Sequence, residues 1–226
     1  MTDITSTLSR KASRANLGGY TPSDDPFISW FGKVLISAPG ERWPTWNGVP
    51  MMPLFQFNLS ELPYRPDNLS DIGFITAFVN QRSITLNAPN GEGWVLRTYK
   101  TKEELIPVDL KQYISSIKPL PIRWVLIDND YPCWPDVPQS LGSSELKRHW
   151  AHKYPNQDCT KIGGWPSYME PDVSWRQVNR DHGQFEYVIQ LDSELKTNWE
   201  WPGECFAYLC RGIGASKGTW TLKWET

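Results

Sequence analysis

Apolar and polar residues alternate along much of this chain, which is the pattern of β-strands that turn one face toward a core. In residues 184–192 the apolar face consists of Phe185, Tyr187, Ile189 and Leu191, and the other face is mostly polar. Similar runs occupy 54–59, 72–79, 94–99, 122–127, 205–210 and 219–224. We therefore predict a short strand over each of these segments.

One segment is typical of an α-helix. Ser143 or Ser144 can cap its start, and Leu146, Trp150 and Tyr154 then repeat near helical spacing before a proline ends the pattern. A shorter helical turn is expected at 101–105, where two glutamates favour the positive end of the helix dipole.

A tight turn is predicted at Asn90-Gly91, between the runs 83–87 and 94–99. This pair readily adopts the positive φ angles of a two-residue hairpin. The two runs are therefore expected to pair as neighbouring strands.

The two halves of the chain carry a similar order of motifs. In the first half, a glycine motif at 30–33 precedes a strand that contains Gln56. In the second half, a glycine motif at 161–166 precedes a strand that contains Gln190. Both strands run into an Asn or Asp that can cap a turn. Matching order across several elements predicts two related units that share one core.

Composition supports a β-rich fold. The chain has 13 Trp, 9 Tyr and 8 Phe with 19 Pro and 16 Gly, a mixture of strand-forming rings and turn formers. We predict an α+β, β-rich fold of two half-repeats of antiparallel strands sharing one core, with few short helices. The half-repeats are placed at about 27–127 and 155–226 within a single domain of 27–226. Residues 128–154 form a linker and helix, and 1–26 form a weakly ordered arm.

Charge and cysteine content narrow the class of protein. The formal net charge is -2, which gives no electrostatic argument for a nucleic-acid partner. No apolar run reaches the roughly 20 residues that cross a membrane, and the N-terminal stretch lacks the apolar core of a secretion signal. The four cysteines form no CxxC pair. We expect a cytoplasmic protein without a membrane or nucleic-acid partner.

Several segments together resemble the YwqG-like family, a bacterial domain of unknown function. They are Pro50–Pro63, Ile72–Phe78, Arg97–Pro107, Lys161-Ile162-Gly163-Gly164-Trp165-Pro166 and Val188–Ser193. The resemblance implies a β-rich α+β fold of two related halves and brings no catalytic residues. It also implies a context, because members are often found as immunity proteins beside polymorphic toxins.

The sequence offers little for catalysis. His149 and His152 lie three residues apart on the predicted helix and could share a metal with Cys159 or His182, but no second spaced pair of ligands accompanies them. The paired carboxylates lie in turns or helix starts, where solvation or capping explains them. We therefore expect no catalytic residues, no cofactor and no metal.

The predicted function is that of an immunity protein, which binds one copy of a cognate toxin in the cytoplasm and blocks its active or substrate-binding face. The alternatives are a hydrolase that reverses the toxin's damage and a module that binds carbohydrate or another small ligand. An acidic, aromatic linker is expected to meet a basic toxin surface together with a second loop, although an ordinary solvated linker explains the same residues. The predicted interface consists of Asp128, Asp130, Tyr131, Trp134 and Asp136 with Glu41, Trp43 and Trp46.

Overall fold

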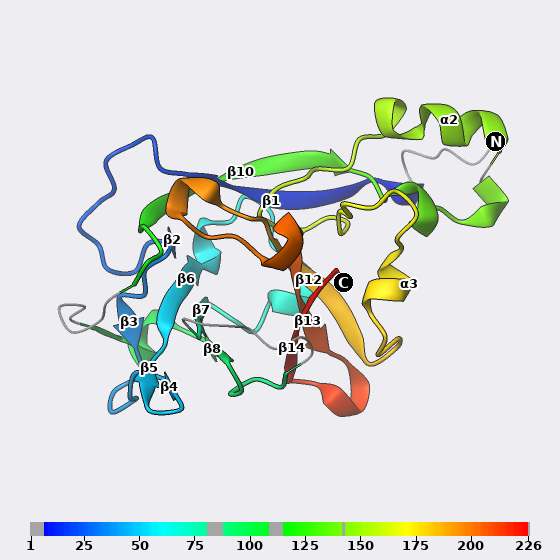
Figure 1. Ribbon diagram of the computed structural model, residues 1–226. Coiled ribbons are helices and arrows are strands. Elements are labelled where there is room, and N and C mark those ends of the chain that lie inside the picture. The colour runs from blue at the N-terminus through cyan, green and yellow to red at the C-terminus, as the bar shows by residue number, and fades with distance from the viewer. Residues whose placement is uncertain (1–6, 81–87, 109–114, 142, 226) are drawn as a thin grey trace. The chain divides into compact units, whose positions relative to one another are not determined.

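A computed structural model describes residues 7–80, 88–108, 115–141 and 143–225 (Figure 1). These residues form two compact units. Unit 1 contains the described parts of Met1–Arg14, Leu126–Ser193 and Trp201–Thr226, and unit 2 those of Ala15–Val125 and Glu194–Glu200. The strands β1 (Arg10–Leu17) and β10 (Leu120–Asp130) contribute residues to both units.

Unit 2 is built on antiparallel strands in the order β10-β2-β6-β7-β8. Two small pairs, β3 with β9 and β4 with β5, accompany this sheet. Its strands are β2 (Trp30–Phe31), β3 (Ile36–Ser37), β4 (Thr45–Trp46), β5 (Val49–Pro50), β6 (Met52–Asn58), β7 (Phe74–Val79), β8 (Trp94–Tyr99) and β9 (Ile106–Pro107). Short 3-10 helices are η1 (Leu59–Glu61), η2 (Asp67–Leu69), η3 (Lys102–Glu104) and η6 (Leu195–Thr197).

The centre of unit 2 is buried on both faces of its sheet, since every residue of β7 is buried. A polar side chain in such a place needs hydrogen-bond partners. Gln56 of β6 has them, because its amide nitrogen donates to the carbonyls of Pro26 and Ile28, each at 2.8 Å, and its oxygen accepts from Leu35 N at 2.8 Å. This one side chain therefore holds the chain on both sides of β2 against the sheet.

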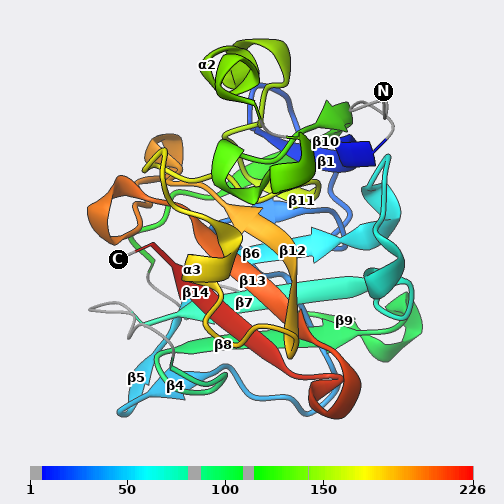
Figure 2. The same cartoon turned by 90° about the vertical axis from the view of Figure 1, so that its right-hand side faces the viewer.

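Unit 1 contains antiparallel strands in the order β14-β13-β12-β11-β1, and Figure 2 shows β12, β13 and β14 side by side. Its strands besides β1 and the end of β10 are β11 (Lys161–Gly163), β12 (Phe185–Leu191), β13 (Ala207–Gly212) and β14 (Trp220–Trp224). The helices are α2 (Ser144–Lys153) and α3 (Trp175–Val178), with 3-10 helices η4 (Trp134–Asp136), η5 (Gln139–Leu141), η7 (Pro202–Glu204) and η8 (Gly214–Ser216).

Gln190 of β12 is also completely buried and hydrogen-bonded. Its nitrogen donates to the Cys159 carbonyl and to Ser167 Oγ, both at 3.0 Å, and its oxygen accepts from Ser167 N at 2.7 Å. The chain on both sides of β11 is thereby held against β12.

The β-rich α+β character predicted from the sequence is confirmed, and every segment of alternating residues overlaps an observed strand. The predicted helix is α2, whose Ser143 side chain accepts from Leu146 N at 3.1 Å. The turn expected at 101–105 contains η3. The run 83–87 lies outside the described residues. No helix in the described segments combines the length and apolar character needed to cross a membrane.

The structure differs from expectation within the N-terminal arm, 1–26, where β1 occupies Arg10–Leu17. Ala12 and Ser13 of this strand are completely buried and pair with β11. Their small side chains contribute little apolar area, so the sequence gives no strand pattern here, although the backbone of β1 pairs with β11.

We expect Gln56→Leu to lower the free energy of unfolding by about 3 kcal/mol, because it leaves a buried N–H and two carbonyls without their partner. Leucine has a similar volume, so the loss reports hydrogen bonding rather than a cavity. Urea denaturation measures the change, with the exposed Gln184→Leu as the control. Equal urea midpoints for the two variants would contradict this role of Gln56.

Candidate functional site

The predicted interface includes the linker segment, defined here as residues 128–136, which lies in unit 1. The segment starts at the end of β10 and passes through η4. Asp128 is exposed, whereas Trp134 and Asp136 are half-buried. Asp130 and Tyr131 are buried. The structure therefore places the members of this predicted set at very different depths.

Asp130 forms an ion pair inside unit 1. Its Oδ2 lies 2.9 Å from Lys161 Nζ, and both side chains are completely buried. Trp165 N donates to the same carboxylate at 2.7 Å, and Gln157 N donates to Oδ1 at 2.9 Å. Burial raises the pKa of Asp130, while the ammonium and the two N–H groups oppose that rise. The expectation that Asp130 contacts a toxin is corrected, because its carboxylate is enclosed by its own unit.

The backbone around this ion pair depends on a glycine. Gly164 has a φ of +70°, and a Cβ at this position would overlap Asp130 Oδ2. The turn after β11 can therefore approach the carboxylate only where residue 164 has no side chain. This gives a physical reason for the second glycine of the Lys-Ile-Gly-Gly-Trp-Pro motif.

Ser167 lies beside the same ammonium, which donates to Ser167 Oγ at 3.4 Å. A serine next to a lysine can act as a nucleophile with its base. Here both side chains are completely buried, and Ser167 Oγ also lies 3.0 Å from the Gln157 carbonyl and 3.0 Å from Gln190 Nε2. The pair therefore fixes the backbone of unit 1 and offers no access to a substrate.

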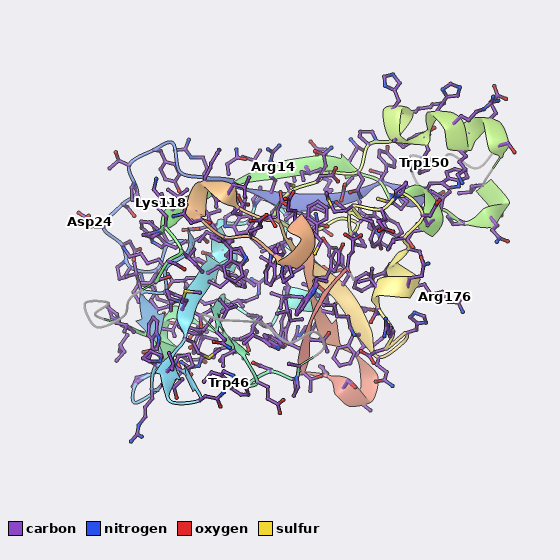
Figure 3. All side chains as sticks on the ribbon, in the orientation of Figure 1. Arg14, Asp24, Trp46, Lys118, Trp150 and Arg176 are labelled. Carbon is purple, nitrogen blue, oxygen red and sulfur yellow. The ribbon has the colours of Figure 1, made fainter. Side chains whose placement is uncertain are left out.

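Aromatic rings hold the middle of the linker segment against α2. The Trp150 indole N–H donates to the Pro132 carbonyl at 2.8 Å, and Figure 3 shows Trp150 directed from α2 toward the rest of its unit. Trp134 packs against Trp150 with ring centroids 5.6 Å apart, and Tyr131 packs against Tyr154 at 5.1 Å. The linker segment and the inner side of α2 thus form one packed layer.

Asp136 is also committed to internal contacts. Its carboxylate accepts from Tyr168 OH at 2.8 Å and from Trp175 N, at the start of α3, at 3.0 Å. Burial raises the pKa of Asp136, and these donors lower it in part. Asp128 is the carboxylate of the linker segment that remains largely exposed, 3.9 Å from Lys11 Nζ. The structure therefore leaves little free negative charge on this segment for a basic partner.

The other predicted interface residues lie in unit 2. Glu41 accepts from Tyr99 OH at 2.6 Å and lies 3.3 Å from Arg97 Nε. The Trp43 indole donates to the Met51 carbonyl at 2.8 Å. Trp46 belongs to the β4–β5 pair, where it is half-buried opposite an exposed Val49. Glu41 and Trp43 thus stabilise their own loop, and Trp46 packs, partly buried, against the cluster that contains Met51 and Phe78.

The cysteines are protonated thiols at neutral pH. Burial raises the pKa of Cys133 to about 11, of Cys159 to about 11 and of Cys210 to about 12, and it also raises that of Cys205. A thiol is a poor nucleophile compared with a thiolate. None of the four is activated for catalysis in this structure.

The histidines considered as metal ligands are exposed. His149 and His152 lie on the outer surface of α2, and His182 is exposed before β12. Among the residues that the structure describes, no three His, Cys, Asp or Glu side chains are grouped closely enough to hold a metal ion. The structure thus does not bring these histidines and Cys159 together.

Sequence reasoning missed the partners that bury the linker segment. Lys161, Asn156 and Ser167 come from 20 to 40 residues further along the chain, and their contacts with it depend on the fold. One signal was present, because a lysine inside the apolar strand β11 requires a buried counter-charge.

A comparison with family profiles matches residues 32–210 to a domain of unknown function, DUF1963. The chain belongs to this family. A search of curated proteins gives no match. The DUF1963 match includes the whole linker segment, α2 and β11, so the Asp130–Lys161 pair lies within the family domain.

We expect Lys161→Met to lower the free energy of unfolding by about 3–5 kcal/mol near neutral pH, since it leaves the buried Asp130 carboxylate without its counter-charge. Removal of the ammonium raises the folded-state pKa of Asp130 further above its unfolded value. The folded state then binds the proton more tightly, so the variant regains stability relative to wild type as the pH falls through that pKa.

Urea unfolding in neutral and in mildly acidic buffer measures this difference, with the exposed Lys217→Met as the control. A destabilisation that is the same at both pH values, or larger in acid, would contradict a charged Asp130 held by Lys161.

We also expect slow alkylation of Cys133, the half-buried cysteine. A pKa of about 11 leaves its thiolate population about 100-fold or more below that of an ordinary cysteine at neutral pH. Iodoacetamide labelling followed by mass spectrometry measures the rate, with the urea-unfolded chain as the reference. Labelling of native Cys133 faster than the unfolded chain would indicate an activated thiolate and favour an enzyme.

Proposed function

We propose that this DUF1963 protein is an immunity protein that forms a one-to-one complex with a cognate bacterial toxin and blocks its active or substrate-binding face. The single observation that supports this best is that side chains able to react are buried in internal contacts. Asp130, Lys161 and Ser167 are completely buried in one network, while the nearby exterior of α2 carries charged side chains. Such a unit is suited to stoichiometric binding, which needs a firm surface and no chemistry.

The linker segment adds rigidity to that surface. The hydrogen-bonded carboxylates of Asp130 and Asp136 fix residues 130–136 of it, and Trp134 lies between them against α2. A surface that is ordered before association loses less conformational entropy on binding. Tryptophan and arginine are also the side chains that most often carry the energy of protein interfaces.

The resemblance to YwqG-like proteins supports the same proposal through the toxin context of that family. We place the protein in the cytoplasm, acting without a cofactor. A hydrolase would need an accessible acid, base or nucleophile, and a carbohydrate-binding module would need an exposed row of tryptophans. Trp94 and Trp201 are almost completely buried, and Trp134 packs against Trp150. These tryptophans form no exposed row, so the observations favour protein binding.

We also propose that the two halves are structural repeats. Gln56 and Gln190 each lie just after a register shift in their strand pair. Each also pairs with a residue of a glycine-motif strand, Gln56 with Trp30 and Gln190 with Lys161. Each glutamine accepts from a backbone N–H beyond that strand and donates to a carbonyl before it. Two unrelated strands would have little reason to share this set of bonds.

Co-expression with the toxin tests the proposed function. The C-terminal domain encoded by the neighbouring upstream gene is expressed in bacteria alone and together with this protein. We expect growth arrest in the first case, with growth and a co-purifying complex in the second. Arrest in both cases, or rescue without any complex, would contradict the proposal.

Variants in the two units locate the interface. We expect Trp134→Ala in unit 1 to weaken the complex by about tenfold or more, as removal of an aromatic anchor does. Trp46→Ala in unit 2 is the matched comparison, and a larger loss there would move the interface to the β4–β5 pair. Surface plasmon resonance on the purified complexes measures both dissociation constants.

A further inference from the structure

The outer face of α2 is an exposed cationic surface. Three of the ten residues of this helix are Lys or Arg and two are His, and all five are exposed. They are Lys147, Arg148, His149, His152 and Lys153. Glu145, in the first turn, is the carboxylate of the helix. This basic face is the set of five residues just given.

The helix is attached to its unit along one side. Trp150 is buried in the cluster with Tyr131 and Tyr154, and Leu146 packs against that cluster partly exposed. In both views no described ribbon of the unit covers the outer side of α2 (Figures 1 and 2). Among the described residues of unit 1, no carboxylate lies within ion-pair distance of Lys147 or Arg148. The charges of Lys147 and Arg148 are therefore not paired within the described part of unit 1.

A rigid support fixes where this charge is presented. Ser143 caps the start of α2, and the Trp150 indole is bonded to the linker segment at 2.8 Å. Trp134, Leu141 and Leu146 are partly buried apolar side chains that pack against the same cluster. Partly exposed apolar side chains together with exposed cations on one helix and its support are the combination found in protein interfaces, in which charged side chains surround a drier centre.

We infer that the basic face of α2 docks onto an acidic protein surface, and that the toxin's contact region is therefore negatively charged. This inference rests on the proposed function and reverses the sign of the partner expected from the sequence. The carboxylates of Asp130 and Asp136 in the linker segment are bonded inside the unit. Lys147 and Arg148, in contrast, are exposed and have no ion pair among the described residues of unit 1. Complementary charge of this kind speeds association and selects the partner.

The composition of the surroundings favours protein over nucleic acid. The chain as a whole carries a net charge of -2, and exposed carboxylates at Asp128 and Asp158 precede and follow the helix. Phosphate backbones would be repelled by those groups. An acidic protein surface can place its carboxylates opposite the helix alone and supply apolar side chains to the partly buried Trp134, Leu141 and Leu146.

Charge reversal on α2 tests the inference in the full-length chain. The variant is Lys147→Glu with Arg148→Glu, and the control is Arg180→Glu with Lys217→Glu, which changes the same charge at exposed positions of the same unit. Circular dichroism and urea midpoints check that both fold. The first probe is poly-L-glutamate at low ionic strength, where electrostatic attraction is least screened.

We expect the α2 variant to bind poly-L-glutamate at least about tenfold more weakly than wild type, and the control to bind about equally. We expect the same pattern for the dissociation constant of the toxin complex, with a steep decrease in wild-type affinity as salt is added. Equal binding of wild type and α2 variant to the toxin would overturn the inference. Tighter binding of wild type to a DNA duplex than to poly-L-glutamate would overturn it as well.

If the proposed function is wrong, the experiments give a different pattern of results. In that case wild type forms no complex with the toxin domain, and the poly-L-glutamate comparison alone decides the inference. Loss of poly-L-glutamate binding in the α2 variant then supports a cationic docking face, and unchanged binding overturns it.

Discussion

The burial of Asp130 opposite Lys161 is the constraint on which unit 1 depends. Two charges removed from water are stable only if each meets the other at close range and their remaining hydrogen-bonding capacity is filled. That requirement brings the Gln157 and Trp165 amides to the carboxylate and Ser167 to the ammonium. It also demands a residue without a side chain at Gly164. One ion pair thus determines the path of the backbone at the end of β10, at β11 and in the turn that follows.

The position of the linker segment follows from this constraint. With Asp130 held near its start and Asp136 bonded to the start of α3 at its end, the residues between these two have little freedom. Trp150 joins this fixed segment to α2, so the orientation of the helix depends on the same network. Asp130, Lys161 and Ser167 are the polar groups that create this rigidity. What unit 1 offers to the outside is a fixed arrangement of aromatic and cationic side chains.

The sequence predicts structure well where the signal is local. The helix α2 is recognisable because Ser143, Leu146 and Trp150 lie within two turns of one another, and the strands because alternation needs only a few residues. The N-terminal strand β1 is not predicted from the sequence, since Ala12 and Ser13 are small and give almost no hydrophobic pattern. The burial of Asp130 is also not predicted, because its counter-charge lies 31 residues further along the chain. A segment of aspartates, aromatic residues and prolines is predicted as an exposed loop when the position of the partner lysine is not known.

The central claim is that this DUF1963 protein acts by occupying a toxin and not by turning over a substrate. Titration of the purified toxin domain with this protein, while the toxin's activity is measured, tests that claim most directly. A stoichiometric blocker predicts that activity declines linearly and ends at one equivalent, with no further change over time. Complete loss of activity or reversal of damage at a small fraction of an equivalent, progressing with time, would show catalysis and contradict the account.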